Sequence, residues 1–291
     1  MVYIKNMKNF LFLLLLIFLI GCFPSKRLTI GMTGLILESV GKACNKSANP
    51  EIIKSGLPAY LMLIDGLIED WPENERLLIA GAQTYCSYAM FIEEEKRDLA
   101  KRLYLKGKRY ALKVLCKNKK FKSALNKPLN EFEKVLKLFS KKYVPALFWT
   151  ASCWLGYIQL SLDSVEALAD LPKAISIIER VLMLNERFYY GSPHLYLGIY
   201  YAARPKSLGG NLNRAKFHFK KAFEISKGKF LMAYVFYAQY YARQKFDKKL
   251  FIETLKKVIE TPQDIEPNLT LANTIAKEKA KKLLEKVDEY F

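Results

Sequence analysis

Residues 191–226, GSPHLYLGIYYAARPKSLGGNLNRAKFHFKKAFEIS, contain two helix-forming runs around a short breaker. In both runs, apolar or small residues recur at steps of three and four, which is the spacing of one helix face. In the second run this face contains Ala215, Phe219 and Ala222. Small residues at such positions let two helix backbones approach closely. The stretch therefore predicts a helical hairpin.

The breaker between the runs contains residues that end and restart helices. Pro205 ends the first helix because it has no backbone N–H to donate. Gly209 and Gly210 turn the chain, and Asn211 is a good N-cap for the second helix. The spacing Ala-x3-Phe-x2-Ala that follows is similar to the second helix of a tetratricopeptide repeat, although this loop is longer than that repeat normally uses.

The same pattern continues through most of the chain. Residues 58–92 repeat it, and almost everything after about Thr33 has helical periodicity, with proline and glycine breakers spaced like helix junctions. Alternating Val/Ile-rich runs are missing. We therefore predict an all-α fold of divergent tetratricopeptide-like hairpin repeats, forming one domain over residues 35–291. Residues 273–291 form an amphipathic capping helix at its end.

Two further segments have distinct compositions. Residues 93–118 and 128–143 are basic and amphipathic, and we interpret them as inserted helices between repeats. Residues 146–160, ALFWTASCWLGYIQL, are apolar on nearly all sides. A helix with that composition belongs in the centre of a fold or beside a cavity.

The N-terminus has the pattern of a bacterial lipoprotein. Lys5 and Lys8 precede an apolar run too short to span a bilayer, and this run ends at Gly21-Cys22. We predict that residues 1–21 are a signal peptide and that Cys22 carries acyl chains such as palmitate. Residues 22–34 would then be the lipidated N-terminus and tether. Several acyl chains anchor a protein to a membrane without spanning it. An uncleaved anchor or an ordinary signal peptide is the alternative.

The formal net charge of the 291-residue chain is +19, carried mostly by scattered lysines. No zinc-finger spacing, RNP-like motif or basic arm is present, and nucleic acid is the wrong partner for an exported protein. We therefore expect no nucleic-acid binding. Anionic lipid headgroups or an acidic partner account better for the charge.

Four cysteines remain after Cys22, each in an apolar helical run, and no two form a Cys-x-x-Cys pair. We expect buried free thiols, since cysteine behaves as a small hydrophobe. An exported compartment also permits disulfides. The four are Cys44, Cys86, Cys116 and Cys153.

The chain offers little catalytic chemistry. Its two histidines, His194 and His218, stand outside any zinc-protease motif, and no nucleophile elbow or phosphate-binding loop occurs. We interpret the acids of residues 93–95 as a solvated helix face rather than a metal site. No nucleophile, base and orienting group can be named together, so we expect a non-enzyme without cofactor or metal.

The aromatic content is high, with 18 Tyr, 18 Phe and 3 Trp. Aromatic side chains dominate cores, and packing between hairpins accounts for most of them. The remainder could line a concave channel for an apolar or amphipathic ligand. Our candidate channel residues are Tyr85, Trp149, Trp154, His194 and Tyr196, with Pro205, Gly209 and Gly210 shaping the wall.

The order of motifs resembles the TatT family, the lipid-anchored tetratricopeptide-like T component of TRAP-type transporters. The proline-to-double-glycine loop, followed by Ala215, His218-Phe219 and Ala222, is the most specific of these motifs. Asn211 and Pro193 depart from the family pattern. The other matching stretches are Leu57-Pro58 with Tyr60, Leu77-Leu78 to Tyr85, Leu147-Phe148-Trp149, Gly191 with His194, and Asn273 to Phe291.

The resemblance implies a homotrimer whose protomers each contain a pore. It also implies a periplasmic substrate-binding protein as partner, and a hydrophobic organic acid or lipid-like ligand passed between the two. The alternative is a tetratricopeptide-type scaffold lipoprotein for outer-membrane protein assembly. A lipid-modified hydrolase would need a catalytic triad. Phe23 is not an acidic retention signal, so an anchor in the outer membrane, facing the periplasm, is favoured.

Overall fold

The computed structural model describes residues 26–291, so the predicted signal peptide and Cys22 lie outside the described residues. Every regular element of the described part is helical, which confirms the all-α prediction. The elements are α2 (Lys26–Asn45), α3 (Pro50–Asp70), α4 (Glu75–Ile92), α5 (Arg97–Leu115), α6 (Lys119–Ala124), α7 (Leu129–Leu136), η1 (Lys141–Tyr143), α8 (Val144–Gln159), α9 (Val165–Ala169), α10 (Leu171–Asn185), α11 (Phe188–Ala202), η2 (Lys206–Leu208), α12 (Leu212–Ser226), α13 (Leu231–Phe236), η3 (Tyr237–Ala242), α14 (Lys248–Glu260), η4 (Pro267–Leu269), α15 (Thr270–Glu285) and α16 (Val287–Tyr290).

The predicted hairpin is formed by α11 and α12. Ala215, Phe219 and Ala222 are buried, as their spacing predicts. A Cβ added at Gly198 of α11 would lie 3.0 Å from the Phe219 ring, so the absence of a side chain there lets the two helices meet. Asn211 caps α12 by accepting a hydrogen bond from the Arg214 N–H at 3.0 Å.

The loop of this hairpin needs both of its glycines. Gly209 has a φ of +88°, in the left-handed region that favours glycine. A Cβ on Gly210 would lie 1.8 Å from the Arg204 carbonyl oxygen. The chain is therefore forced into one path between α11 and α12.

The apolar helix α8 is buried among its neighbours, as expected. Its residues from Ala146 to Trp154 are all buried, and it contacts α4, α5 and α10. The tether assigned to residues 22–34 is helical from Lys26 onward, because Ile30 and Leu37 give the start of α2 a buried face.

One part of the predicted insertion is wrong. Residues 93–118 mostly form α5, which pairs with α4 and packs on α8 as part of the core. The reason is the small residue Gly107, where a Cβ would lie 3.1 Å from the Ala82 carbonyl oxygen. The short helices α6 and α7 do form a side piece, and they contact each other and α10.

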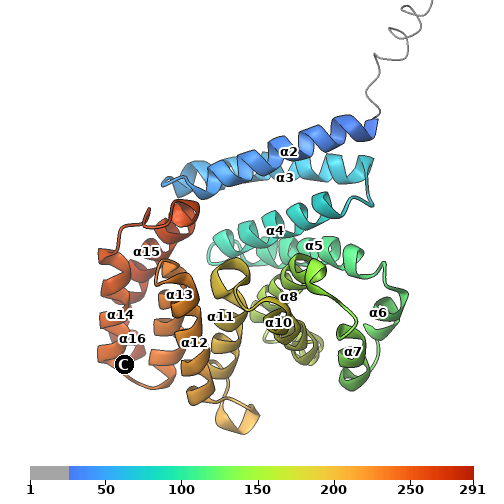
Figure 1. Cartoon of the computed structure of the whole chain (residues 1–291). Coiled ribbons are helices and arrows are strands. Elements are labelled where there is room, and N and C mark those ends of the chain that lie inside the picture. The colour runs from blue at the N-terminus through green and yellow to red at the C-terminus, as the bar shows by residue number, and fades with distance from the viewer. Residues whose placement is uncertain (1–25) are drawn as a thin grey trace, which may run out of the picture.

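The helices close into a ring around the centre of the molecule (Figure 1). Contacts run from α2 through α3, α4, α5, α8, α10, α11, α12, α13 and α14 to α15, and α15 contacts both α2 and α3. Residues 273–291 were expected to form a capping helix of the array, and α15 forms most of this segment. It also joins the two ends of the array.

Candidate functional site

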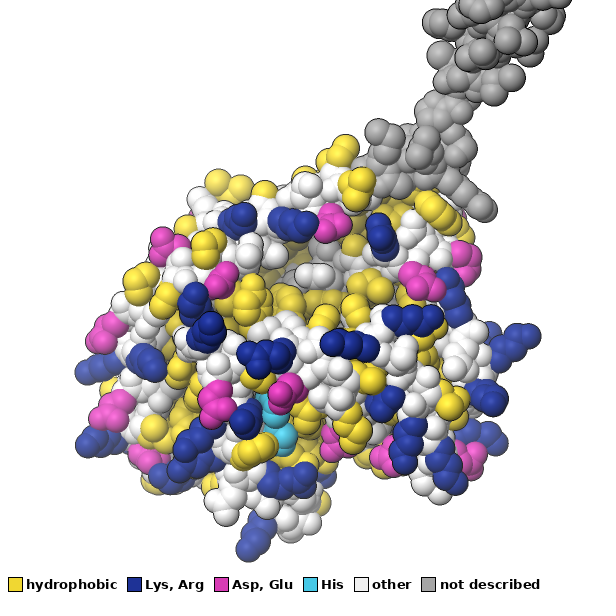
Figure 2. All heavy atoms as spheres, viewed as in Figure 1, with side chains coloured by type: hydrophobic (Ala, Val, Ile, Leu, Met, Phe, Trp, Pro, Cys, Tyr) yellow, Lys and Arg dark blue, Asp and Glu magenta, His cyan; other side chains and the backbone are white. Residues whose placement is uncertain are grey.

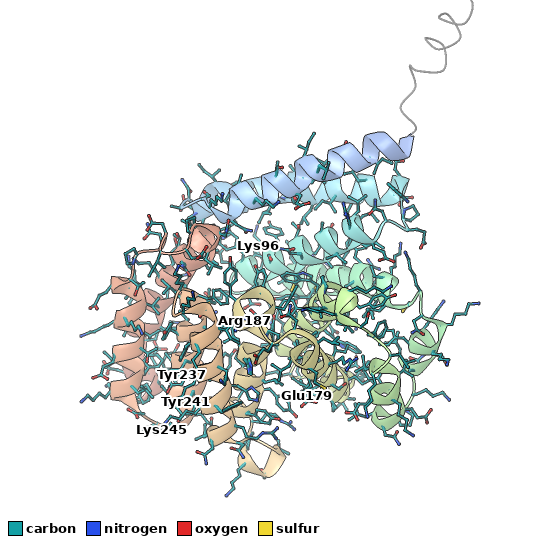
Figure 3. The ribbon with its side chains drawn as sticks, viewed as in Figure 1. Lys96, Glu179, Arg187, Tyr237, Tyr241 and Lys245 are labelled. Atoms are coloured by element: carbon teal, nitrogen blue, oxygen red, sulfur yellow. The ribbon has the colours of Figure 1, made fainter. Side chains whose placement is uncertain are left out.

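The face shown in Figure 2 has a hollow between the α2–α3 hairpin and the helices below it, with apolar side chains on its floor. Figure 3 places Lys96, in the turn before α5, and Arg187, just before α11, at the edges of this hollow. Both side chains are exposed, and neither forms an ion pair among the described residues. Two unpaired cations therefore border an apolar space.

Four polar side chains near the turn before α5, the start of α11 and η3 are only partly buried: Glu93, Tyr189, Tyr196 and Tyr240. Burial raises the pKa of Tyr189 and of Tyr240 to about 12, so both phenols are neutral hydrogen-bond donors at neutral pH. We take these residues, with the hollow, as the candidate site.

A strained turn presents two tyrosines at the start of α11. Tyr189, Tyr190 and Gly191 have φ values of 45°, 59° and 80°, so three successive residues are left-handed. Each non-glycine residue in that conformation costs roughly 1–2 kcal/mol. Tyr189 is thereby turned toward Trp149, with ring centroids 5.3 Å apart. Pro193 is tolerated because the right-handed helix begins only after this turn.

A second irregular element faces the same region. η3 (Tyr237–Ala242) is a π-helix, a form that is rare and often found at functional sites. Tyr240 lies on it, and its phenol is electrostatically coupled to the Glu93 carboxylate. The side-chain oxygen of Gln239, on the same element, is buried without a hydrogen-bond partner in the described structure. Such an orphaned acceptor is what a bound ligand or water would satisfy.

The interpretation of residues 93–95 as solvated holds for Glu94 and Glu95, which are more than half exposed, but it is wrong for Glu93. Glu93 is half-buried, and its carboxylate accepts a hydrogen bond from the Tyr104 hydroxyl at 2.6 Å. Glu94 pairs with Lys279 of α15 at 3.2 Å, and Glu95 pairs with Lys54 of α3 at 2.6 Å. Glu94 and Glu95 therefore link α15 and α3 to the turn before α5, and Glu93 links that turn to α5 itself.

Two of the predicted channel residues lie in separate polar networks. The Tyr85 hydroxyl donates to Asp65 at 2.6 Å, and the ring is almost wholly buried between α3 and α5. The Trp154 indole donates to Asp170 at 3.0 Å, and the Lys108 ammonium lies 4.1 Å above its ring. These contacts account for Tyr85 and Trp154 as structural residues without a role in a channel.

Two others come together around Phe148. The rings of Trp149 and Tyr196 each contact Phe148, with centroids 5.0 and 5.8 Å from it. Pro205 and Gly209 are exposed in the loop after the last turn of α11. Roughly 20 Å of helix separates that loop from the tyrosines at the start of α11. A wall-shaping role for Pro205, Gly209 and Gly210 stays a prediction.

His194 belongs to a buried histidine pair. Its Nδ1 lies 2.9 Å from Nδ1 of His218, and its Nε2 lies 3.3 Å from a Glu186 carboxylate oxygen. The imidazole of His218 also stacks on Tyr201. Burial, then the neighbouring His194 and Arg214, lowers the pKa of His218 to about 4. Burial likewise lowers the pKa of His194, against the opposing effect of Glu186.

This pair predicts acid sensitivity. Between pH 6.5 and pH 4, His218 is protonated in the unfolded chain but neutral in the folded chain. The free energy of unfolding therefore decreases as the pH falls through this range. At pH 5 the loss relative to pH 7.5 is roughly 2 kcal/mol from this residue. Urea unfolding at both pH values measures it. His218→Phe keeps the ring stack and should show a smaller loss. An equal pH loss in both proteins would contradict the assignment.

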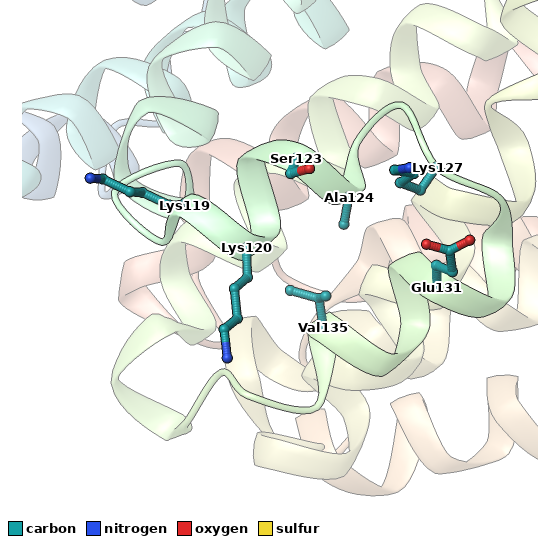
Figure 4. Close-up of a pocket in the computed structure, with 7 residues that line it drawn as sticks. All are labelled: Lys119, Lys120, Ser123, Ala124, Lys127, Glu131 and Val135. Carbon is teal, nitrogen blue, oxygen red and sulfur yellow. The ribbon is translucent and has the colours of Figure 1, made fainter.

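Two other depressions of the surface are open and lined mainly by charged side chains. The depression in Figure 4 lies between α6 and α7, is open to solvent, and is lined mostly by lysines and short side chains. A second open depression lies along α14. In the described part of the chain, no group of three or more metal-ligating side chains comes together. No helix within residues 26–291 is both long and apolar enough to cross a membrane.

Sequence reasoning missed Glu93, Tyr240, Lys96 and Arg187. Glu93 could have been singled out because it directly follows the apolar face of α4. The two cations carry no sequence signal, since they are ordinary members of a lysine-rich surface. The position of Tyr240 depends on a π-helix that no local pattern predicts.

A family model described as the TRAP transporter T-component matches residues 46–291. A protein of Treponema pallidum (strain Nichols), described only as uncharacterized, is 23% identical over 259 residues. That similarity covers 83% of this chain and 80% of the relative.

Proposed function

The chain belongs to the TRAP transporter T-component family, and from that premise we propose that it docks a periplasmic substrate-binding protein of its transport system. We further propose that it is tethered to a membrane through acylated Cys22, is a homotrimer, and passes a ligand through its ring. The observation that supports ligand passage is the circuit of helix contacts that α15 closes with α2 and α3, together with the partly exposed tyrosines of α11 and η3.

The chemistry of the hollow supports an amphipathic anion as the ligand. Aromatic and aliphatic side chains suit an apolar body, and the neutral phenols of Tyr189 and Tyr240 can donate hydrogen bonds. Lys96 and Arg187 at the edge can attract a carboxylate. A hydrophobic organic acid has both features.

The two cations give a direct test of this ligand class. In the double variant Lys96→Gln/Arg187→Gln, we expect decanoate, used as a probe, to bind about tenfold more weakly, because two exposed charge contacts are lost. Quenching of tryptophan fluorescence would report binding, since Trp149 contacts Tyr189. Lys245→Gln is the control, because Lys245 already pairs with Asp247. Equal affinity in all three proteins would argue against the proposed ligand class.

Native mass spectrometry of the detergent-solubilised chain, with and without the binding protein, tests the docking. We expect a trimer that captures the binding protein, with a small mass retained on one of them. A monomer that ignores the binding protein and captures outer-membrane assembly factors would instead favour the scaffold function.

A further inference from the structure

The positive charge of the chain is concentrated in one stretch. Residues 96–142 contain 17 lysines and arginines against three acids, a net charge of +14 out of the +19 of the whole chain. This stretch forms α5, α6, α7 and η1. We call the surface from Lys113 to Lys142 the basic lobe.

The charges of the basic lobe point into solvent. Ten lysines of the lobe are exposed. Within the described residues, only Lys106 and Lys117 among the seventeen cations of the stretch form ion pairs with carboxylates. The exposed lysines are Lys113, Lys117, Lys119, Lys120, Lys122, Lys127, Lys134, Lys137, Lys141 and Lys142.

The basic lobe is held firmly on the ring. Phe121 packs against Phe132 and Phe139, with ring centroids 5.5 and 5.1 Å apart, and all three side chains are buried. From α10, Lys173 donates to the Leu125 carbonyl at 2.7 Å, and Arg180 donates to the Phe139 carbonyl at 2.5 Å. These bonds fix the positions of the lysines relative to the fold.

The basic lobe adjoins the end of the fold at which the N-terminal segment leaves. Lys117 pairs with Glu75 of α4 at 2.9 Å, and Gly34 of α2 lies against Leu77 of α4. Figure 1 shows α6 and α7 on the same side of the molecule as the start of α2. The four residue-to-residue steps from Cys22 to Lys26 can span at most about 14 Å.

We propose that the basic lobe lies against the anionic lipid headgroups of the membrane that holds the anchor. The proposal rests on the lipid anchor of the proposed function. An acyl anchor places this side of the ring near the bilayer, and each lysine close to an anionic surface then adds attraction. The contact orients the ring with respect to the membrane. An acidic protein is the weaker candidate, because nothing in the fold brings one to this side.

The test uses the acylated full chain on vesicles and reads each lysine separately. Vesicles are made of phosphatidylcholine alone or with 30% phosphatidylglycerol, a composition chosen to be roughly as anionic as a bacterial leaflet. Lysines are acetylated briefly and located by mass spectrometry. On anionic vesicles we expect Lys119, Lys120 and Lys127 to react roughly fivefold more slowly than on neutral ones, and the protection to disappear in high salt.

The chain offers a matched control on another helix. Lys248, Lys249 and Lys256 line the open depression on α14 and should react equally on both vesicles. The triple variant Lys119→Gln/Lys120→Gln/Lys127→Gln should lose the protection of Lys113 and Lys134, and the same change at the three α14 lysines should not. Protection on neutral vesicles, equal protection of α14, or protection only after adding an acidic protein would each overturn the proposal.

A flotation assay tests the lipid anchor of the proposed function separately. If the acylated protein does not float with neutral vesicles, the anchor is wrong. If it floats but the lysines of the basic lobe are not protected on anionic vesicles, the anchor stands and the membrane contact of the basic lobe is wrong.

Discussion

Phe219→Ala is expected to lower the free energy of unfolding by about 4 kcal/mol, the largest loss that we expect from a single side chain. The ring is fully buried, fills the space that Gly198 leaves on α11, and packs edge-on against Tyr237 at 5.3 Å. It therefore joins α11 and α12 to the π-helix. Its removal leaves a cavity at the meeting point of three elements.

The chain supplies a matched control two residues away. Phe217 lies on the same helix, but 54% of its surface is exposed. Phe217→Ala should cost less than about 1 kcal/mol. Urea unfolding at pH 7.5, followed by circular dichroism at 222 nm, compares the two. Similar losses would mean that the α11–α12 hairpin is not the packing centre that its sequence indicates.

The hairpin itself could be predicted because its information is local. Gly198 and Ala202 lie at helical spacing in the first run, and Ala215, Phe219 and Ala222 lie at helical spacing in the second, so the packing face of each helix is visible in the sequence. The same reasoning located α8, which is apolar all round. It failed for α5, whose contact with the core depends on Gly107 meeting a carbonyl of another helix. A glycine within a basic helix does not show, from the sequence, which other helix packs against it.

Closure of the ring could not be predicted, since it depends on pairs far apart in the sequence. Glu94 and Lys279 look like ordinary surface charges until the fold brings them to 3.2 Å. The irregular turns of the site are hidden for a related reason. Tyrosine disfavours the left-handed region, so local preference argues against the conformation that Tyr189 and Tyr190 adopt. Tertiary packing overrides that preference.

A partly buried polar centre holds the N-terminal hairpin to the ring. Asp65 of α3 accepts hydrogen bonds from the hydroxyls of Tyr85 and Tyr110, both at 2.6 Å, and from the Lys106 ammonium at 2.5 Å. One carboxylate thereby serves donors from both α4 and α5. Burial opposes its ionisation, but the bonds from Lys106, Tyr110 and Tyr85 outweigh burial and hold the pKa of Asp65 below its usual range.

Asp65→Ala should lower the free energy of unfolding at pH 7 by about 2–3 kcal/mol, because it leaves two hydroxyls and an ammonium without their acceptor. The value stays below that of a fully buried pair, since the Asp65 side chain keeps 28% of its surface exposed. Glu69→Ala, at an exposed position on the same helix, should cost less than about 0.5 kcal/mol. Urea unfolding of the three proteins measures the difference.

The pH dependence of this loss identifies its cause. A carboxyl whose pKa is lowered by folding stabilises the protein above the unfolded value of about 3.9, and this contribution disappears as the pH falls through the folded value. Wild type and Asp65→Ala should therefore differ fully at pH 7 and converge toward pH 3. If the difference is the same at both pH values, Asp65 acts by packing alone, and the ionised carboxylate is not what holds α3 to α4 and α5.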